Sequence, residues 1–233
     1  MRGKLIVFEG VDGAGKTTQL QQIAQWLQQN KLLPPEHPIE ITHEPGATRL
    51  GSHLRQLLLE TEGWTDEFLR DRTELLLYAA DRTQHVDSFL NPKLEQGTII
   101  LCDRYIDSTT AYQGYGRGLN LTLIDQLNAI ATSGLESDLT LWLDVDVTVG
   151  LARMRRRGET DRMEQADLAF YQRVQRGFAT LYQSNPQRIV RIDGNQSEAA
   201  VTEQIQTVLN QRLIEWYSPP SHPYLDKVRP PRS

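Results

Sequence analysis

Eight consecutive residues near the start of the chain have the types and spacing needed to bind phosphate groups. They are Gly10-Val11-Asp12-Gly13-Ala14-Gly15-Lys16-Thr17, followed by Thr18, and they fit the pattern G-x-x-x-x-G-K-[ST]. In such a loop, backbone N–H groups surround an anion, and the N-terminus of the next helix adds a partial positive charge. We expect Lys16 to reach the β- and γ-phosphates and the Thr17 hydroxyl to ligate Mg²⁺. The nine residues are therefore predicted to bind a nucleoside triphosphate.

The segments on both sides of this loop have the apolar patterns that it needs. Leu5–Glu9 starts with an apolar run typical of a buried parallel strand. Between Thr18 and Gln29, apolar side chains recur at the spacing of one helix face. A strand, a glycine-rich loop and a helix, in this order, form the setting in which such a loop holds phosphates.

The rest of the chain repeats this alternation of strands and helices. Further apolar strand patterns lie at Ile39–His43, Thr98–Asp103, Leu139–Asp144 and Arg188–Asp193. Further helical patterns lie at Leu50–Leu59, Arg72–Leu90, Leu121–Thr132, Asp167–Tyr182 and Ser197–Trp216. Together these elements predict an α/β fold, in which a five-stranded parallel sheet is flanked by helices on both faces.

The composition is that of a soluble globular protein, with 39% hydrophobic and 24% charged residues. We expect one domain over residues 1–217 and a proline-rich, disordered or extended tail over 218–233. The net charge of −5 argues against a general nucleic-acid binder, and no apolar run approaches the roughly 20 residues of a membrane span. The chain enters its first strand too early for a signal peptide, and its lone cysteine, Cys102, suits a reducing compartment. We therefore expect a cytoplasmic protein.

Polar residues stand where several predicted strands end. Because ligands of parallel α/β sheets bind beyond the carboxyl ends of the strands, these residues are expected near the site. They are Glu9, Glu44, Asp103, Arg104, Asp144 and Asp146.

Arginines on separate segments indicate chemistry on a second charged group. Arg55, Arg82 and Arg104 are far apart in sequence, and a run of arginines over 153–157 precedes the polar break Gly158–Asp161. Phosphoryl transfer between two phosphates concentrates negative charge, so its catalysis is mostly positioning and cationic stabilisation. We expect residues of about 150–164 to form a small arginine-rich lid.

The motifs of the chain, in their order, resemble those of the thymidylate kinase family of phosphate-loop nucleoside monophosphate kinases. The resemblance runs from about Lys4 to Leu213. Besides the phosphate loop, it rests on Glu44–Gly46, Leu77–Arg82, Asp103–Tyr105 with Ala111–Gly114, and Arg157–Glu164. It implies the nucleotide kinase fold and the transfer of the γ-phosphoryl group of ATP to dTMP, with Mg²⁺ as cofactor.

For dTMP, the resemblance implies a binding site made by nine residues. Arg55 and Arg104 would hold the phosphate of dTMP, Tyr78 would stack on the thymine, and Arg82 would bond to its edge. Tyr112 would crowd the 2′ position of the sugar, and Asp12 would accept from the 3′-hydroxyl. The complete set is Asp12, Glu44, Arg55, Tyr78, Arg82, Arg104, Thr109, Tyr112 and Gln113.

For catalysis, the resemblance implies Lys16 and Arg104 together with a lid arginine. Some members of the family carry an arginine inside the phosphate loop, but this loop has none, so Arg153 or Arg157 would stabilise the transferred group. Asp103, with Thr17, would act on Mg²⁺ or its waters. The segment 193–196 is a candidate edge for adenine.

Two residues beside the acceptor site depart from the family pattern. His43 stands where arginine is usual, and Ala47 where a second glycine is usual, so a close analogue of dTMP is conceivable as the acceptor. The family is typically dimeric, which implies a homodimer, and the helix Arg72–Leu90 could take part.

Three other functions make different demands on the sequence. A deoxynucleoside kinase would use Glu44 as general base to deprotonate a 5′-hydroxyl, whereas a phosphate acceptor needs cations and no base. A regulatory nucleotide-binding module would not need the catalytic set. A GTPase is not expected, because Asn30-Lys31-Leu32-Leu33 lacks the aspartate of the pattern N-K-x-D.

Overall fold

The computed structural model of the protein describes residues 2–30, 37–59, 69–156 and 166–217. Most of the predicted lid, from residue 157 onward, and the tail 218–233 lie outside the described residues. Among the helices that are described, none is long and apolar enough to cross a membrane.

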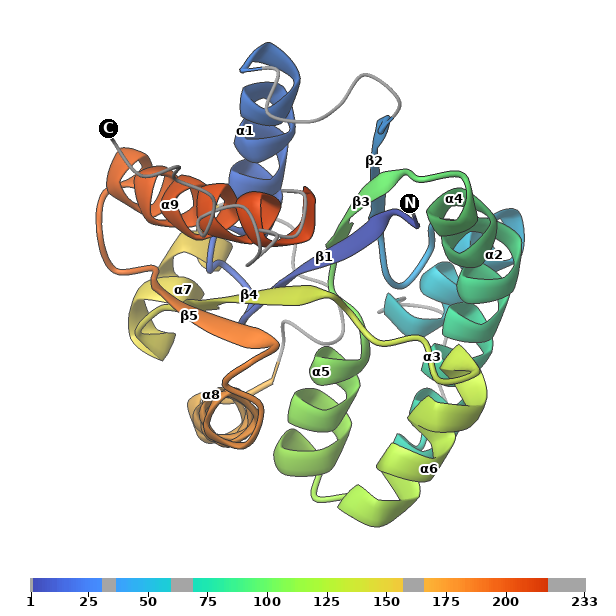
Figure 1. The fold of residues 1–233 in the computed structure, drawn as a ribbon. Coiled ribbons are helices and arrows are strands. Elements are labelled where there is room, and N and C mark those ends of the chain that lie inside the picture. The colour runs from blue at the N-terminus through green and yellow to red at the C-terminus, as the bar shows by residue number, and fades with distance from the viewer. Residues whose placement is uncertain (1, 31–36, 60–68, 157–165, 218–233) are drawn as a thin grey trace, which may run out of the picture.

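A parallel sheet of five strands forms the centre of the molecule (Figure 1). The strands follow the order β2-β3-β1-β4-β5, and every neighbouring pair is parallel. Their bounds are β1 Lys4–Glu9, β2 Ile39–His43, β3 Ile99–Asp103, β4 Leu139–Asp144 and β5 Ile189–Asp193. The predicted fold class is confirmed, and no strand bound differs from its prediction by more than one residue.

Alternation along β1 divides the core between the two faces of the sheet. Ile6 and Phe8 belong to one buried cluster, whereas Leu5 and Val7 belong to another. Two helices, α1 (Lys16–Gln29) and α9 (Glu198–Tyr217), cover the face that carries Ile6 and Phe8. Because both faces are buried, the strand is a nearly continuous apolar run.

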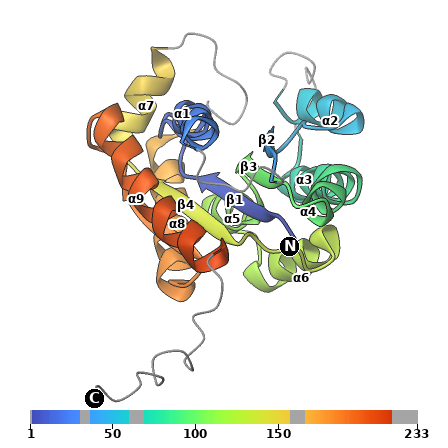
Figure 2. The same ribbon diagram turned by 45° about the horizontal axis from the view of Figure 1, so that its top comes forward.

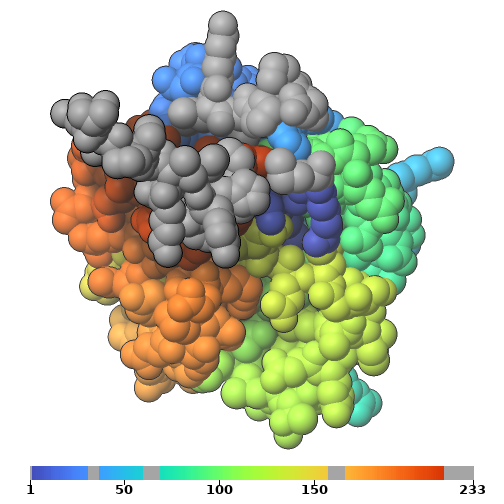
Figure 3. All heavy atoms as spheres, viewed as in Figure 1, coloured from blue at the N-terminus to red at the C-terminus, as the bar shows by residue number. Residues whose placement is uncertain are grey.

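The remaining helices surround the sheet on its other face and at its edges (Figure 2). The α-helices are α2 Arg49–Leu59, α3 Asp71–His85, α4 Asn91–Glu95, α5 Ile106–Thr109, α6 Leu121–Thr132, α7 Val147–Arg155 and α8 Leu168–Ser184. Two π-helices, η1 Val86–Leu90 and η2 Thr110–Gly116, continue α3 and α5. In Figure 3, α8 (orange) and α6 (yellow-green) form the lower surface, with the green of α5 and η2 between them.

Several helical regions differ from the sequence-based expectation. Helices α4 and α7 were not among the predicted helices, and α7 includes residues 150–155 of the expected lid. The predicted helix Arg72–Leu90 begins one residue earlier and changes into η1 at Val86, where the residues per turn increase. The helical segment 106–116 was not predicted, because its short polar residues show no apolar periodicity. This segment matters, since it carries several residues of the candidate site.

Loops that follow neighbouring strands are joined at the carboxyl edge of the sheet. The backbone N–H of Arg104 donates to the Phe8 carbonyl at 3.0 Å, and that of Glu44 donates to the Asp103 carbonyl at 3.0 Å. The ends of β1, β2 and β3 are thereby fixed relative to one another, and the residues that follow them converge.

Candidate active site

The phosphate loop is closed around its own lysine. Lys16 is buried, and its Nζ donates to the carbonyl oxygens of Gly10 and Val11 at 3.1 and 3.0 Å. Gly13 has a φ of 77°, and a Cβ there would lie 2.1 Å from the Gly150 carbonyl oxygen of α7. Only glycine fits that position, so α7 packs directly on the loop. Burial, and next the charge of Arg104, lower the pKa of Lys16 to about 8.

A large cavity opens beside this loop. It has a volume of about 820 Å³, and residues 12–18 of the loop line it. Asp103, Arg104, Arg153 and Gly194 line it from other segments. Gly10 and Val11, which were predicted to bind the nucleotide, do not line it and instead hold Lys16.

Thr17 and Asp103 meet at the floor of this cavity. Register places Asp103 opposite Phe8, so both side chains point to the α1 face of the sheet. The Thr17 hydroxyl donates to Oδ2 of Asp103 at 2.7 Å. A hydroxyl and a carboxylate are the oxygen ligands that suit Mg²⁺ together with waters and phosphates.

A second, smaller cavity adjoins the first. Its volume is about 100 Å³, and all nine residues that were predicted to bind dTMP line it. Asp12, Glu44, Arg55 and Arg104 line both cavities. Two binding spaces therefore share one wall, and that wall carries two arginines.

Arg104 lies at the junction of the two cavities in a strained backbone conformation. Its φ of 72° is rare for a residue with a side chain. Its guanidinium forms an ion pair with Asp12, bonds to the Ser108 hydroxyl at 3.1 Å and the Tyr112 hydroxyl at 3.2 Å, and lies over the Tyr112 ring. Backbone strain of this kind persists where the surroundings fix the residue, and it is common at active sites.

The Asp12 carboxylate joins the phosphate loop to the acceptor side. The Tyr112 hydroxyl donates to its Oδ2 at 2.9 Å. Burial pushes the pKa of Asp12 upward, but the charges of Arg104 and Lys16 outweigh burial, and the net shift is downward. Asp12 is therefore ionised at neutral pH.

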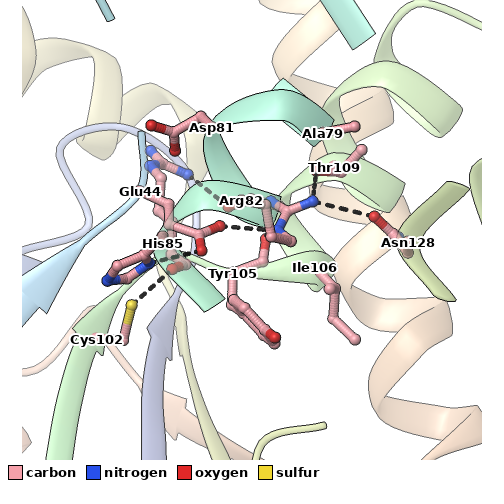
Figure 4. Close-up of polar contacts among 12 residues, drawn as sticks. Glu44, Ala79, Asp81, Arg82, His85, Cys102, Tyr105, Ile106, Thr109 and Asn128 are labelled. Atoms are coloured by element: carbon pink, nitrogen blue, oxygen red, sulfur yellow. Dashed lines mark hydrogen bonds and ion pairs between the residues drawn. The ribbon is translucent and has the colours of Figure 1, made fainter. Parts of the chain in front are cut away.

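Arg82 is the centre of a buried polar network (Figure 4). Its guanidinium donates to Glu44 at 2.8 Å, Thr109 at 2.9 Å, Asn128 at 3.0 Å and the Tyr105 carbonyl at 3.1 Å. These partners come from the loop after β2, from α5 and the residue before it, and from α6, so the guanidinium plane is held from several sides. An arginine fixed in this way can present its remaining hydrogen-bonding capacity in one direction.

Both carboxylate oxygens of Glu44 have partners in this network. Oε2 accepts from Arg82 at 2.8 Å, and Oε1 is 2.9 Å from Nδ1 of His85. Burial alone would raise the pKa of Glu44, but Arg82 and His85 overcome it, so the pKa is lowered. A carboxylate with a lowered pKa and two engaged oxygens is poorly suited to take a proton from a hydroxyl group.

Glu9 lines neither cavity, but it supports residues of the site through contacts that the sequence did not reveal. It is fully buried, and it accepts hydrogen bonds from the backbone N–H of Tyr105 at 2.8 Å and of Ser108 at 3.1 Å. The Ser108 hydroxyl donates to its other oxygen at 2.6 Å. Burial and the nearby Asp107 raise the pKa of Glu9 to about 7. Its position at a strand end was the one available signal.

The predicted lid arginines, the candidate adenine segment and the strand-end aspartates differ in whether they line a cavity. Arg153 lines the large cavity with Nη1 3.5 Å from the Gly194 carbonyl, whereas Arg157 lies outside the described residues. Gly194 and Gln196, from the candidate adenine segment, also line that cavity. Asp144 and Asp146 were expected near the site, but neither lines a cavity; Asp144 pairs with Arg191, and Asp146 caps α7.

Comparison with known proteins agrees with this geometry. The family model described as thymidylate kinase matches residues 8–205. The chain belongs to the thymidylate kinase family. It is 56% identical over 230 residues to the thymidylate kinase of Cyanothece sp., covering 93% of this chain and 97% of that protein. It is 58% identical to that of Nostoc punctiforme, with 91% and 98% covered.

A solved structure extends the likeness to three dimensions. The crystal structure of thymidylate kinase from Ehrlichia chaffeensis matches with a TM-score of 0.70 and 34% identity, covering 90% of this chain and 99% of that one. Membership in the thymidylate kinase family does not favour the alternative of a deoxynucleoside kinase, in agreement with the engaged oxygens of Glu44.

Proposed function

We propose that this chain is a dTMP kinase, which transfers the γ-phosphoryl group of ATP to dTMP and yields dTDP and ADP. The observation that carries this proposal is the pair of adjoining cavities with Arg104 in their common wall. A donor phosphate and an acceptor phosphate, placed in the two cavities, would meet at that arginine. The chain has the positioning and the cations that such a transfer requires.

On the donor side, residues 12–18 bind the phosphates of ATP, and Lys16 is the cation among them. The first residues of α1 line the large cavity, so the partial positive charge of the helix N-terminus lies beside it. An incoming phosphate replaces the Gly10 and Val11 carbonyls as the partner of Lys16. Gly194 and Gln196 line the far part of the cavity and are proposed to border adenine.

On the acceptor side, Arg55 and Arg104 hold the phosphate of dTMP. Both line the shared wall, and Arg55 is anchored by its bond to the Pro45 carbonyl at 2.9 Å. Phosphate monoesters have a second pKa of about 6, so the attacking oxygen is already charged at pH 7 and needs no base. Tyr78, Arg82, Thr109 and Gln113 line the same cavity and are proposed to contact the base and sugar.

The chemistry of the residues present fits a magnesium ion beside the phosphates. Thr17 and Asp103, joined at 2.7 Å, would hold it or its waters at the floor of the large cavity. When bound, the ion would neutralise charge on the phosphates. A lid arginine, Arg153 or Arg157, is proposed to stabilise the transferred group, a contribution worth roughly 10³–10⁵ in rate for arginines of this kind.

We also propose that the enzyme is a cytoplasmic homodimer built through one helical face. Helix α3 is in contact with both α2 and α6 (Figures 1 and 2). Each carries exposed large apolar residues: Leu57 on α2, Leu76 on α3, and Leu121, Leu123 and Ile130 on α6. An apolar surface of this kind on a domain suits burial against a second copy.

The decisive experiment measures ADP release from Mg·ATP with dTMP, with thymidine, or with no acceptor. Turnover with dTMP but not with thymidine is expected. Turnover with thymidine alone would overturn the proposal and assign a base role to Glu44. ATP binding without release with any acceptor would indicate a regulatory module instead.

A further inference from the structure

The side-chain amide of Gln113 is held in one orientation. Gln113 belongs to η2, is almost fully buried and lines the small cavity. Its Nε2 donates to Oε1 of Glu74, on α3, at 2.8 Å. Glu74 has no exposed surface and does not line the cavity. The amide therefore lies between a buried carboxylate and the space proposed for the base.

The chemistry of Glu74 determines which end of the amide turns toward it. An ionised carboxylate can only accept hydrogen bonds, so it pairs with the NH₂ group of an amide and repels the carbonyl oxygen. Arg117 Nη2 lies 3.4 Å from the second oxygen of Glu74, so each oxygen of this carboxylate faces a donor, the NH₂ group of Gln113 or the guanidinium of Arg117. The carbonyl oxygen of Gln113 is left on the side away from Glu74.

We propose that Glu74 is a positioning residue that sets the base preference of the acceptor cavity. By binding the NH₂ group of Gln113, it commits the amide oxygen to accept a hydrogen bond from a ring N–H of the base. Thymine and uracil carry a hydrogen on N3, whereas cytosine has a lone pair there. This inference rests on the proposed function and specifies how its acceptor is selected.

Arg82 supplies a hydrogen-bond donor to the base, which complements the acceptor oxygen of Gln113. Within the described residues, four of its five guanidinium hydrogens have protein acceptors: Glu44, Thr109, Asn128 and the Tyr105 carbonyl. The fifth guanidinium hydrogen would be donated to the 4-oxo group of the base. A donor from Arg82 and an acceptor from Gln113 match a 4-oxo pyrimidine and oppose a 4-amino pyrimidine. A site built to pair such groups rejects an analogue that leaves them unpaired.

The test compares dTMP with 5-methyl-dCMP, which has the same methyl group, sugar and phosphate. The measured quantity is the ratio of kcat/KM for dTMP to kcat/KM for 5-methyl-dCMP. In Glu74→Gln the new amide can donate as well as accept a hydrogen bond, so the side-chain amide of Gln113 can flip by 180°. We expect the ratio to fall at least about tenfold, because a buried hydrogen bond is gained by one substrate and lost by the other.

A matched control separates base readout from the loss of a charge near Arg117. Asp71, also on α3, lies 3.6 Å from Nε of Arg117 and is half exposed, and its side chain does not bond to Gln113. Asp71→Asn should leave the ratio unchanged. Gln113→Leu should lower it, and Glu74→Gln should add nothing further in the Gln113→Leu background, since the two residues act as one unit.

The proposal fails if the ratio is unchanged in Glu74→Gln or in Gln113→Leu, or if both substrates lose activity equally. Thermal melts establish that each variant is folded. If Glu74→Gln does not fold, Glu74→Met, which also removes the acceptor, takes its place in the same comparison. Absence of dTMP turnover in the wild type would overturn the proposed function itself. Normal turnover with an unchanged ratio would overturn only the role of Glu74.

Discussion

The hydroxyl of Thr17 lies 2.7 Å from Oδ2 of Asp103, although the two residues are 86 positions apart in sequence. One stands in the first turn of α1 and the other at the last position of β3. The contact joins the phosphate loop to a strand beside β1 in the sheet, and it places two oxygen ligands at the floor of the large cavity.

Asp103→Asn should raise the Mg²⁺ concentration needed for half-maximal activity by roughly 10- to 100-fold, the range found when a residue supporting a metal site is lost. The variant keeps the shape of the side chain but loses its charge. A magnesium titration of ATP turnover checks this. The matched control is Asp87→Asn, an exposed aspartate on η1, and an equal shift in both variants would contradict the assignment.

Arg104→Ala should raise the KM for dTMP by roughly 10- to 100-fold, as expected for loss of hydrogen bonds to a charged group. The KM for ATP should change much less. Steady-state kinetics with each substrate varied in turn measure both constants. Arg212→Ala, on α9 and lining neither cavity, is the control. An unchanged KM for dTMP would remove Arg104 from the acceptor phosphate.

Glu44→Gln should lower the free energy of unfolding by about 3 kcal/mol, because it leaves the buried charge of Arg82 without its partner. Since the pKa of Glu44 is lowered in the folded state, its stabilisation is present above pH 4.5 and is lost as pH falls. The difference between wild type and variant should therefore shrink in acid. Urea unfolding at several pH values measures it.

The same variant separates the two possible roles of Glu44. A structural and positioning role predicts that kcat with dTMP stays within about tenfold of the wild type. A general base contributes about 10²–10⁴ in rate, so a loss of that size in a fully folded variant would contradict our assignment.

Glu9→Gln should make the protein more stable at neutral and alkaline pH relative to the wild type. The pKa of Glu9 is raised from 4.5 to about 7, so folding favours its protonated form. The stabilisation is complete below pH 4.5 and is lost as pH rises through 7, a change of up to about 3 kcal/mol. Unfolding at pH 5 to 8 would reveal it as a slope that Glu9→Gln lacks.

An exposed carboxylate provides the comparison for that slope. Glu203→Gln, on the exposed side of α9, should keep the wild-type pH dependence. A slope that survives in Glu9→Gln would assign the pH dependence to another group. Loss of the slope in both variants would show that it reflects net charge.

The central strands β1, β3 and β4 were predictable because each is a short, almost fully buried apolar run. The edge strands β2 and β5 are partly exposed and were recognised from their apolar residues. Ile39–His43 and Leu139–Asp144 have the predicted bounds without change. The change from α3 to η1 at Val86 was not predictable, because a widened turn leaves the apolar pattern almost unaltered. The helical segment 106–116 has no apolar periodicity that would predict it. Its start is fixed instead by Glu9, which accepts hydrogen bonds from the backbone N–H groups of Tyr105 and Ser108.

Residues that follow a motif were predictable as part of the site, whereas their buried partners were not. The loop residues and the nine acceptor residues came from motif spacing and resemblance, and they line the two cavities with the exception of Gly10 and Val11. Glu74, His85, Ser108 and Asn128 act on residues from other elements. Their contacts form only when the chain has folded, and no local sequence pattern predicts them.

The shared wall between the two cavities has a thermodynamic consequence. Asp12, Glu44, Arg55 and Arg104 face both spaces, so a nucleotide in one space alters the charges that the other nucleotide meets. If dTMP changes the dissociation constant of ATP by some factor, then ATP must change that of dTMP by the same factor. The binding of the two substrates is therefore expected to be coupled, so that the dissociation constant of each depends on whether the other is bound.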